Sequence, residues 1–208
     1  GSSQYRFGPH STGGSINYLT TPIGLGTKYF GSVSYGSGND VITHDYANYG
    51  IAGDWGAFAI LGEVYYRNGG GRRDFNIDPP SSSVHRKNYG SDELGDMNHL
   101  APMVKMLWQL PTRRNMVFEV KYAYEDNNYN QSYAGQTTAD FNANPHQQYV
   151  GYQLGEYNTE HHTSYVKFRA DINSNISNQT TTYYNFFTRD WFKLDKVISG
   201  GTTCSLET

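Results

Sequence analysis

The sequence predicts an all-β protein, an antiparallel meander that forms part of a transmembrane β-barrel. Apolar and polar residues alternate with a period of two in several segments, as expected of strands with two unlike faces. These segments are about ten residues long, which suits a strand that crosses a membrane. Their connections alternate between short turns and long loops, and this asymmetry is typical of outer-membrane barrels.

Seven strands are predicted from the alternation. They span residues 27–37, 41–53, 57–67, 97–110, 116–124, 162–172 and 179–189.

The first three strands are separated by glycine-containing turns. Tyrosine and valine side chains share one face of the first strand, and a Gly-Ser-Gly-Asn-Asp turn follows at 36–40. The second strand is polar and ends at a turn over residues 53–56. In the third strand, Glu63 and Arg67 share the face opposite Phe58. Gly and Asn in such clusters favour turns because they tolerate left-handed backbone conformations.

The last four strands alternate more regularly. Val104 and Trp108 face one way in the fourth strand, and Lys105 faces the other. The fifth strand, residues 116–124, carries an apolar side chain at every second position. The sixth strand alternates in the same way and leads through an Asn-rich turn at 173–178 into the seventh.

One face of these strands collects charged side chains. The residues predicted on this face are Glu63, Lys105, Glu119, Lys121, Lys167, Arg169 and Asp171. A charged face suits a water-filled barrel lumen, although a soluble antiparallel sheet with one solvated face alternates similarly. The long loops predicted at 68–96 and 125–160 favour the barrel. Within the second, Thr-Thr-Ala-Asp-Phe-Asn-Ala ahead of Pro145 predicts one helical turn.

Composition excludes several classes of protein. The chain has 208 residues, and its longest apolar runs fall far short of the ~20 residues of a membrane helix. The net charge of −3 argues against nucleic-acid binding. A single cysteine, Cys204, excludes an internal disulfide framework and a thiolate zinc cluster. It falls in a tail, residues 199–208, that is predicted to be loop-like.

Residues 5–22, YRFGPHSTGGSINYLTTP, resemble the closing part of the plug domain of TonB-dependent outer-membrane receptors. The family pattern joins Arg-aromatic-Gly to Gly-Gly, Ile-Asn, Thr and Pro, and leads directly into the first barrel strand. The matching residues are Arg6, Phe7, Gly8, Gly13, Gly14, Ile16, Asn17, Thr20 and Pro22.

Two later segments are similar to ferric-citrate-type receptors of the same family. The segment at 133–145 carries Asp-Phe and Asn-Pro, and that at 180–194 ends in Arg-Asp-Trp-Phe-Lys-Leu. One departure is clear: Gln147 and Gln148 stand where relatives have arginines, so no anion contact is transferred to them.

The resemblance implies a plugged barrel, which has 22 strands in this class of transporter. Residues 1–24 would be the C-terminal end of the plug domain, and residues 25–208 the N-terminal portion of the barrel, about seven of 22 strands. Since 22 strands of about 9–11 residues need about 220 residues within the membrane alone, the chain is expected to be part of a longer receptor that aggregates when isolated in water.

The resemblance also implies a function. The protein would lie in the outer membrane of a Gram-negative-type bacterium, in contact with outer-membrane lipid, and import a ferric chelate, iron-citrate or another siderophore. The TonB–ExbB–ExbD complex would supply the energy. Two alternatives stay open: a TonB-dependent receptor for a saccharide or cobalamin, and a soluble β-rich glycan-binding domain that uses its Tyr and Trp side chains.

Arginines are the candidate ligand-binding residues, because guanidinium groups form paired hydrogen bonds with carboxylate-rich chelates. They are Arg67, Arg72, Arg73 and Arg86 in or beside the first long loop, where Lys87 adds charge, and Arg189 in the last strand. His161 and His162 are adjacent, so on a strand they point to opposite faces and do not share a metal ion. No catalytic constellation is evident, and the sequence predicts neither enzyme activity, nor a cofactor, nor a metal site.

Overall fold

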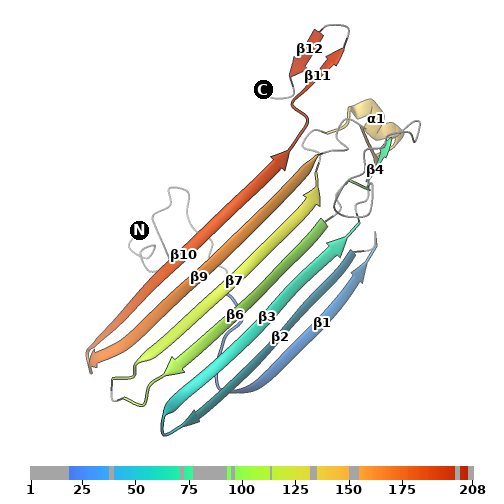
Figure 1. Cartoon of the computed structure of the whole chain (residues 1–208). Helices are drawn as coiled ribbons and strands as arrows, with labels where there is room; N and C mark the ends of the chain where they lie inside the picture. The colour runs from blue at the N-terminus through green and yellow to red at the C-terminus, as the bar shows by residue number, and fades with distance from the viewer. Residues whose placement is uncertain are drawn as a thin grey trace.

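A computed structural model of the chain (Figure 1) describes residues 19–37, 40–70, 73–76, 93–94, 97–112, 114–131, 135–149, 155–199 and 202–205. Seven antiparallel strands form one meander sheet in the order β1-β2-β3-β6-β7-β9-β10. They are β1 (Gly26–Gly36), β2 (Asp40–Gly53), β3 (Gly56–Gly69), β6 (Met97–Gln109), β7 (Val117–Asn130), β9 (Glu156–Asn173) and β10 (Ile176–Phe192). The all-β class and the seven predicted strands are confirmed.

The sheet is open. Among the described residues, β1 pairs only with β2, and β10 pairs only with β9. The predicted barrel is therefore not confirmed, because a barrel requires its edge strands to pair with other strands.

The connections follow the predicted asymmetry. Figure 1 shows the β2–β3, β6–β7 and β9–β10 turns at one end of the sheet and the long connections, with α1 and β4, at the other. The short connection from β1 to β2 is also at that second end, where Gly36 pairs with Asp40. At the turn end, Gly56 has φ +107, a conformation that L side chains rarely adopt, and a Cβ there would lie 2.1 Å from the carbonyl oxygen of Gln109. We call the opposite end, where the long connections emerge, the loop end.

The predicted loop over residues 125–160 is wrong at both of its ends. β7 continues to Asn130 and β9 begins at Glu156, and these two residues are paired in the register. The added residues, such as Asn127, Asn128 and Asn158, are polar on both faces of the sheet. Without an apolar face there is no period-two signal, so the sequence pattern cannot reveal these strand ends.

Shorter elements lie beyond the main sheet. Helix α1 (Thr138–Ala143) confirms the predicted helical turn. Strands β4 (Arg73–Asn76), β5 (Glu93–Leu94) and β8 (Gln147–Tyr149) form a small sheet that joins the two long connections. The tail is not loop-like as predicted: β11 (Lys196–Ser199) and β12 (Thr202–Ser205) pair there, and Cys204 lies in β12. No helix in the described ranges is long and apolar enough to cross a membrane.

The register gives the main sheet two unlike faces. On one, the apolar face, rings align across four strands, since Phe58 pairs with Trp108, Trp108 with Phe118, and Phe118 with Phe168. The other, the polar face, carries the charged residues predicted to lie together. It includes His44, Asn48, Glu63, Arg67, Lys105, Glu119, Lys121, Tyr165, Lys167 and Arg169.

The apolar face is the more exposed of the two. Val104, Trp108 and Val166 are 39%, 47% and 47% exposed. Polar residues interrupt this face, among them Asp45 on β2 and His162 on β9. His162 is hydrogen-bonded to the Tyr122 hydroxyl (2.8 Å) and to Glu160 (2.9 Å). A soluble sheet packs its apolar face into a core, so an uncovered one signals contact with something outside these residues.

Candidate functional site

The polar face holds a cluster of charges at its centre. A hydrogen bond joins Glu63 Oε1 to His44 Nε2 at 2.8 Å. Glu119 accepts a hydrogen bond from Tyr165 and lies 3.4 Å from the ammonium of Lys167. These pairs join neighbouring strands, so the polar face carries its charges largely in compensated groups.

Residues 19–25, which we call the leading segment, run across this face before β1 begins. The Lys105 ammonium donates to the Thr21 carbonyl oxygen at 2.5 Å. The Asn48 amide donates to the carbonyl oxygens of Gly24 (2.9 Å) and Gly26 (3.0 Å), and its oxygen accepts from the Gly24 N–H (3.2 Å). One buried side chain therefore uses both donors and its acceptor to hold the segment.

Close packing supports these hydrogen bonds. Leu61 is fully buried on the polar face. A Cβ placed on Gly50 would lie 2.4 Å from the Gly24 carbonyl oxygen and 2.8 Å from the Cα of Leu25. Only glycine at position 50 allows the leading segment to approach β2 this closely.

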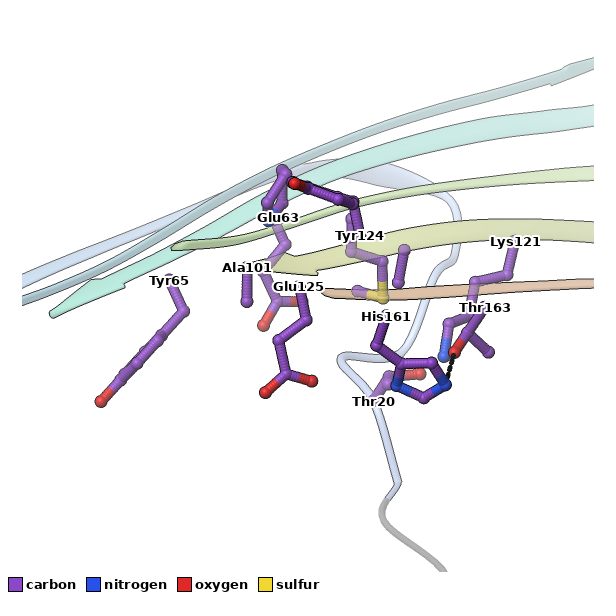
Figure 2. A pocket seen from close by; sticks show the side chains of 12 residues that line it. Thr20, Glu63, Tyr65, Ala101, Lys121, Tyr124, Glu125, His161 and Thr163 are labelled. Atoms are coloured by element: carbon purple, nitrogen blue, oxygen red, sulfur yellow. Dashed lines mark hydrogen bonds between the residues drawn. The ribbon is translucent and has the colours of Figure 1, made fainter. Parts of the chain in front are cut away.

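An open hollow of about 210 Å³ lies beside the leading segment, and its lining includes Glu63, Tyr65, Lys121, Glu125 and His161. Figure 2 shows Tyr65, Glu125 and His161 pointing to the side of the sheet on which Thr20 lies. His99 Nε2 lies 3.2 Å from Glu125 Oε1, outside hydrogen-bond geometry. The hollow can hold a polar group, but the described residues contain no cluster of three potential metal ligands.

The structure separates the histidine pair as the sequence predicted. His161 lies on the polar face and hydrogen-bonds to Thr163 Oγ1 at 3.2 Å. His162 lies on the apolar face.

The candidate arginines have different surroundings. Arg67 forms a paired interaction with Asp40, with Nε–Oδ1 at 3.0 Å and Nη2–Oδ2 at 2.8 Å, so its guanidinium already has a carboxylate partner. This ion pair links β3 to β2, and it occupies the guanidinium donors that would otherwise be available to a ligand. Arg73 lies in β4, and its side chain is outside the described part, as are Arg72, Arg86 and Lys87 entirely.

Arg189 is exposed on the polar face of β10. Arg189 pairs with Thr159 on β9. The same row of paired residues continues across the sheet through Asn127 and His99 to Arg67 on β3. Two of the candidates thus share one face and one level, four strands apart, or about 19 Å in a flat sheet.

Sequence reasoning missed an aromatic row next to Arg189. Tyr129 on β7 pairs with Tyr157 on β9, and Tyr157 pairs with Trp191 on β10. The ring centroids are 5.0 Å and 5.8 Å apart. The sequence does not predict this row, because the row depends on the pairing of β7 with β9 within residues 125–160, where the sequence predicts a loop.

The second long connection is organised by a small polar network. The Thr137 hydroxyl caps α1 by accepting from the Asp140 N–H (3.2 Å), and the Tyr149 hydroxyl donates to Asp140 Oδ2 (2.5 Å). Hydrogen bonds from Tyr149 and then from Thr137 lower the pKa of Asp140 below its ordinary value, because they stabilise the carboxylate.

The chain matches no family model, no curated protein and no solved structure.

Proposed function

We propose that this chain forms part of a TonB-dependent outer-membrane receptor that imports a ferric chelate. The observation that carries the proposal is the contrast between the two sheet faces. The apolar face is exposed across the sheet, whereas the polar face carries the charges and the leading segment. A barrel in a membrane needs this arrangement, with apolar side chains toward lipid and polar side chains toward the lumen.

The height of the apolar face supports contact with a bilayer. On β3, the apolar side chains of this face run from Phe58 to Tyr66, which is about 26 Å along a strand at 3.3 Å per residue. A strand tilt of about 40° reduces this to roughly 20 Å of thickness, close to the ~25 Å apolar band of outer-membrane barrels.

Beyond this apolar band, the paired residues on the same face of the sheet are polar. Toward the loop end, Asn68, Asn98, Asn128 and Asn158 align across four strands of the same face. A row of amides suits the hydrated region outside the hydrocarbon core, where side chains find hydrogen-bond partners.

The leading segment supports the plug-to-barrel order that the resemblance implies. It crosses the polar face, is held there by Asn48 and Lys105, and enters β1 at Gly26. In the proposed receptor, this face lines the lumen, and the residues before position 25 belong to the plug. The TonB–ExbB–ExbD complex would act on that plug and open the lumen to the chelate.

Binding and transport of this kind need no covalent step and no cofactor. Arg189 is the described candidate for ligand contact, since it is exposed on the polar face near the loop end, while Arg67 pairs with Asp40. A guanidinium there would attract an anionic chelate.

Iron uptake tests the function. Cells lacking the gene, and the same cells with the full-length gene restored, are compared for uptake of iron supplied as labelled ferric citrate and other ferric chelates. We expect uptake of at least one chelate to fall in the deletion strain and to return on complementation. Unchanged uptake of every ferric chelate tested contradicts the iron assignment.

Fractionation tests the location separately. We expect the native product in detergent-extracted outer membranes. Recovery from the soluble periplasm would instead favour the β-rich glycan-binding domain.

A further inference from the structure

Three aromatic side chains form a continuous surface at the loop end of the polar face. We call Tyr129, Tyr157 and Trp191 the aromatic shelf. They come from three adjacent strands, so the shelf is about 10 Å wide at the ordinary strand spacing. Trp191 is 40% exposed. Because the side chains stand on strands rather than on loops, the paired backbone fixes their spacing.

Two cations flank the shelf. The Arg189 guanidinium carbon lies 6.0 Å, and the Lys193 ammonium nitrogen 4.9 Å, from the centroid of the Trp191 ring. Both distances allow a cation–π interaction. A group bound on the shelf therefore meets ring faces and positive charge together.

Charge is divided between the two faces at this level of the sheet. Asp126, Glu160 and Asp190 lie on the side that continues the apolar face. On the shelf's own side, Glu125 on β7 stands in the row next to that of Arg189, and its Oε1 lies 3.2 Å from His99 Nε2. Asp40, farther away on β2, is paired by Arg67. Most of the carboxylates at this level thus lie on the opposite face, and the charged groups in contact with the shelf itself are the cations Arg189 and Lys193.

We propose that the aromatic shelf binds an anionic chelate that carries aromatic rings, such as a ferric catecholate, rather than an aliphatic one such as ferric citrate. The inference rests on the proposed receptor function and names the chemical class of its ligand. Ligand rings pack on the shelf in offset or edge-to-face contacts. The negative charge of the chelate is met by Arg189 and Lys193.

Other ligand classes use only part of this surface. An aliphatic carboxylate chelate meets the two cations but offers no ring to the shelf. A neutral saccharide packs on the rings but gains nothing from the two cations. Of these three classes, only an anion with aromatic groups uses the rings and the cations together.

Binding to the full-length gene product, purified in detergent, tests the proposal. The probes are gallium(III) tris-catecholate, gallium(III) citrate and a neutral maltooligosaccharide, and gallium avoids the quenching that iron causes. Calorimetry gives the affinities, and tryptophan fluorescence reports the shelf through Trp191. We expect the catecholate to bind at least about tenfold more tightly than the citrate.

Variants separate the rings from the charges. We expect Trp191→Ala to weaken catecholate binding about tenfold and citrate binding less than about twofold, whereas Trp191→Phe keeps most of the affinity. Arg189→Gln should weaken both anions by about fivefold. Tyr184→Ala is the matched control, because Tyr184 lies on the same strand but on the apolar face. Heat-modified mobility on gels verifies that each variant is folded.

The outcomes distinguish this inference from the function on which it rests. Equal or tighter binding of citrate or of the saccharide, or unchanged catecholate binding by folded Trp191→Ala, overturns the aromatic shelf as the ligand site. If citrate uptake in cells still depends on the gene in that case, the receptor function stands. Absence of any gene-dependent chelate uptake overturns the function itself.

Discussion

An arginine placed at the middle of the apolar face should measure whether that face meets lipid. Val104 lies four residues from Trp108 and four from Leu100, the ends of the apolar rows on β6. At 3.3 Å per residue it is about 13 Å along the strand from each end, or roughly 10 Å in depth at a tilt of 40°. In the proposed barrel, Val104 is thus the midplane position of β6.

The two environments predict different costs for Val104→Arg. Arginine at the midplane of a membrane barrel destabilises by about 2–4 kcal/mol, and 3 kcal/mol lowers the folding equilibrium constant by roughly 150-fold. On a water-exposed sheet face, a substitution of a partly exposed valine changes stability by about 0.5 kcal/mol or less. The difference is several times larger than the usual error of a denaturant titration.

The assay is urea unfolding of the full-length gene product in lipid vesicles. Three controls lie on the same strand. Leu100→Arg, at the edge of the apolar rows, should cost about 0–1 kcal/mol, and Asn98→Arg, beyond them, should cost about nothing. Met103→Arg points to the polar face opposite Glu63 and should be tolerated. If Val104→Arg costs no more than Asn98→Arg, the apolar face does not contact lipid and the reasoning is wrong.

Three further predictions concern the leading segment and the α1 network. Asn48→Ala should destabilise by about 1–3 kcal/mol, because it leaves buried backbone groups without partners, and limited proteolysis should then cut the leading segment faster. Gly50→Ala should release the same segment, whereas Gly62→Ala should not, since a Cβ at position 62 meets nothing within 4 Å; equal cleavage of the two variants would contradict the close-packing argument. The pKa of Asp140 is lowered in the folded protein, so its stabilising contribution is complete above the unfolded pKa and is lost as pH falls through the folded value. NMR titration should show Tyr149→Phe moving that pKa back upward, and an unmoved pKa would rule out the hydrogen bond as its cause.

The sequence pattern predicts the part of the fold in which the two faces differ. Over β6, Val104, Met106 and Trp108 alternate with Lys105, and the structure places these side chains on opposite faces as expected. The burial of Lys105 was not predictable, because its partner is a backbone carbonyl more than eighty residues away in sequence. A period-two pattern reports which face a side chain is on, but not what covers that face.

The candidate site was less predictable for the same reason. Arginine content in the first long connection pointed to Arg67, but its pairing with Asp40 depends on the β2–β3 register. Arg189 lies on the face that the sequence predicts. Its neighbour Trp191 contacts Tyr157 only because β7 and β9 extend beyond the apolar part of the sheet, and the sequence does not predict that extension. Contacts between strands depend on register, and register is fixed by turns and pairing rather than by composition.

The extension of the strands beyond the apolar rows has a consequence for recognition. A membrane barrel needs only about 9–11 residues per strand to cross the bilayer, whereas β9 has 18 residues and β10 has 17. In the proposed receptor, the additional length places Tyr157, Arg189 and Trp191 beyond the membrane-spanning part while they stay within a paired sheet. Ligand contacts made from such strands are held more precisely than contacts made from long loops. The affinity of the aromatic shelf should therefore respond more strongly to variants that break the β9–β10 pairing at Thr159 than to substitutions in α1.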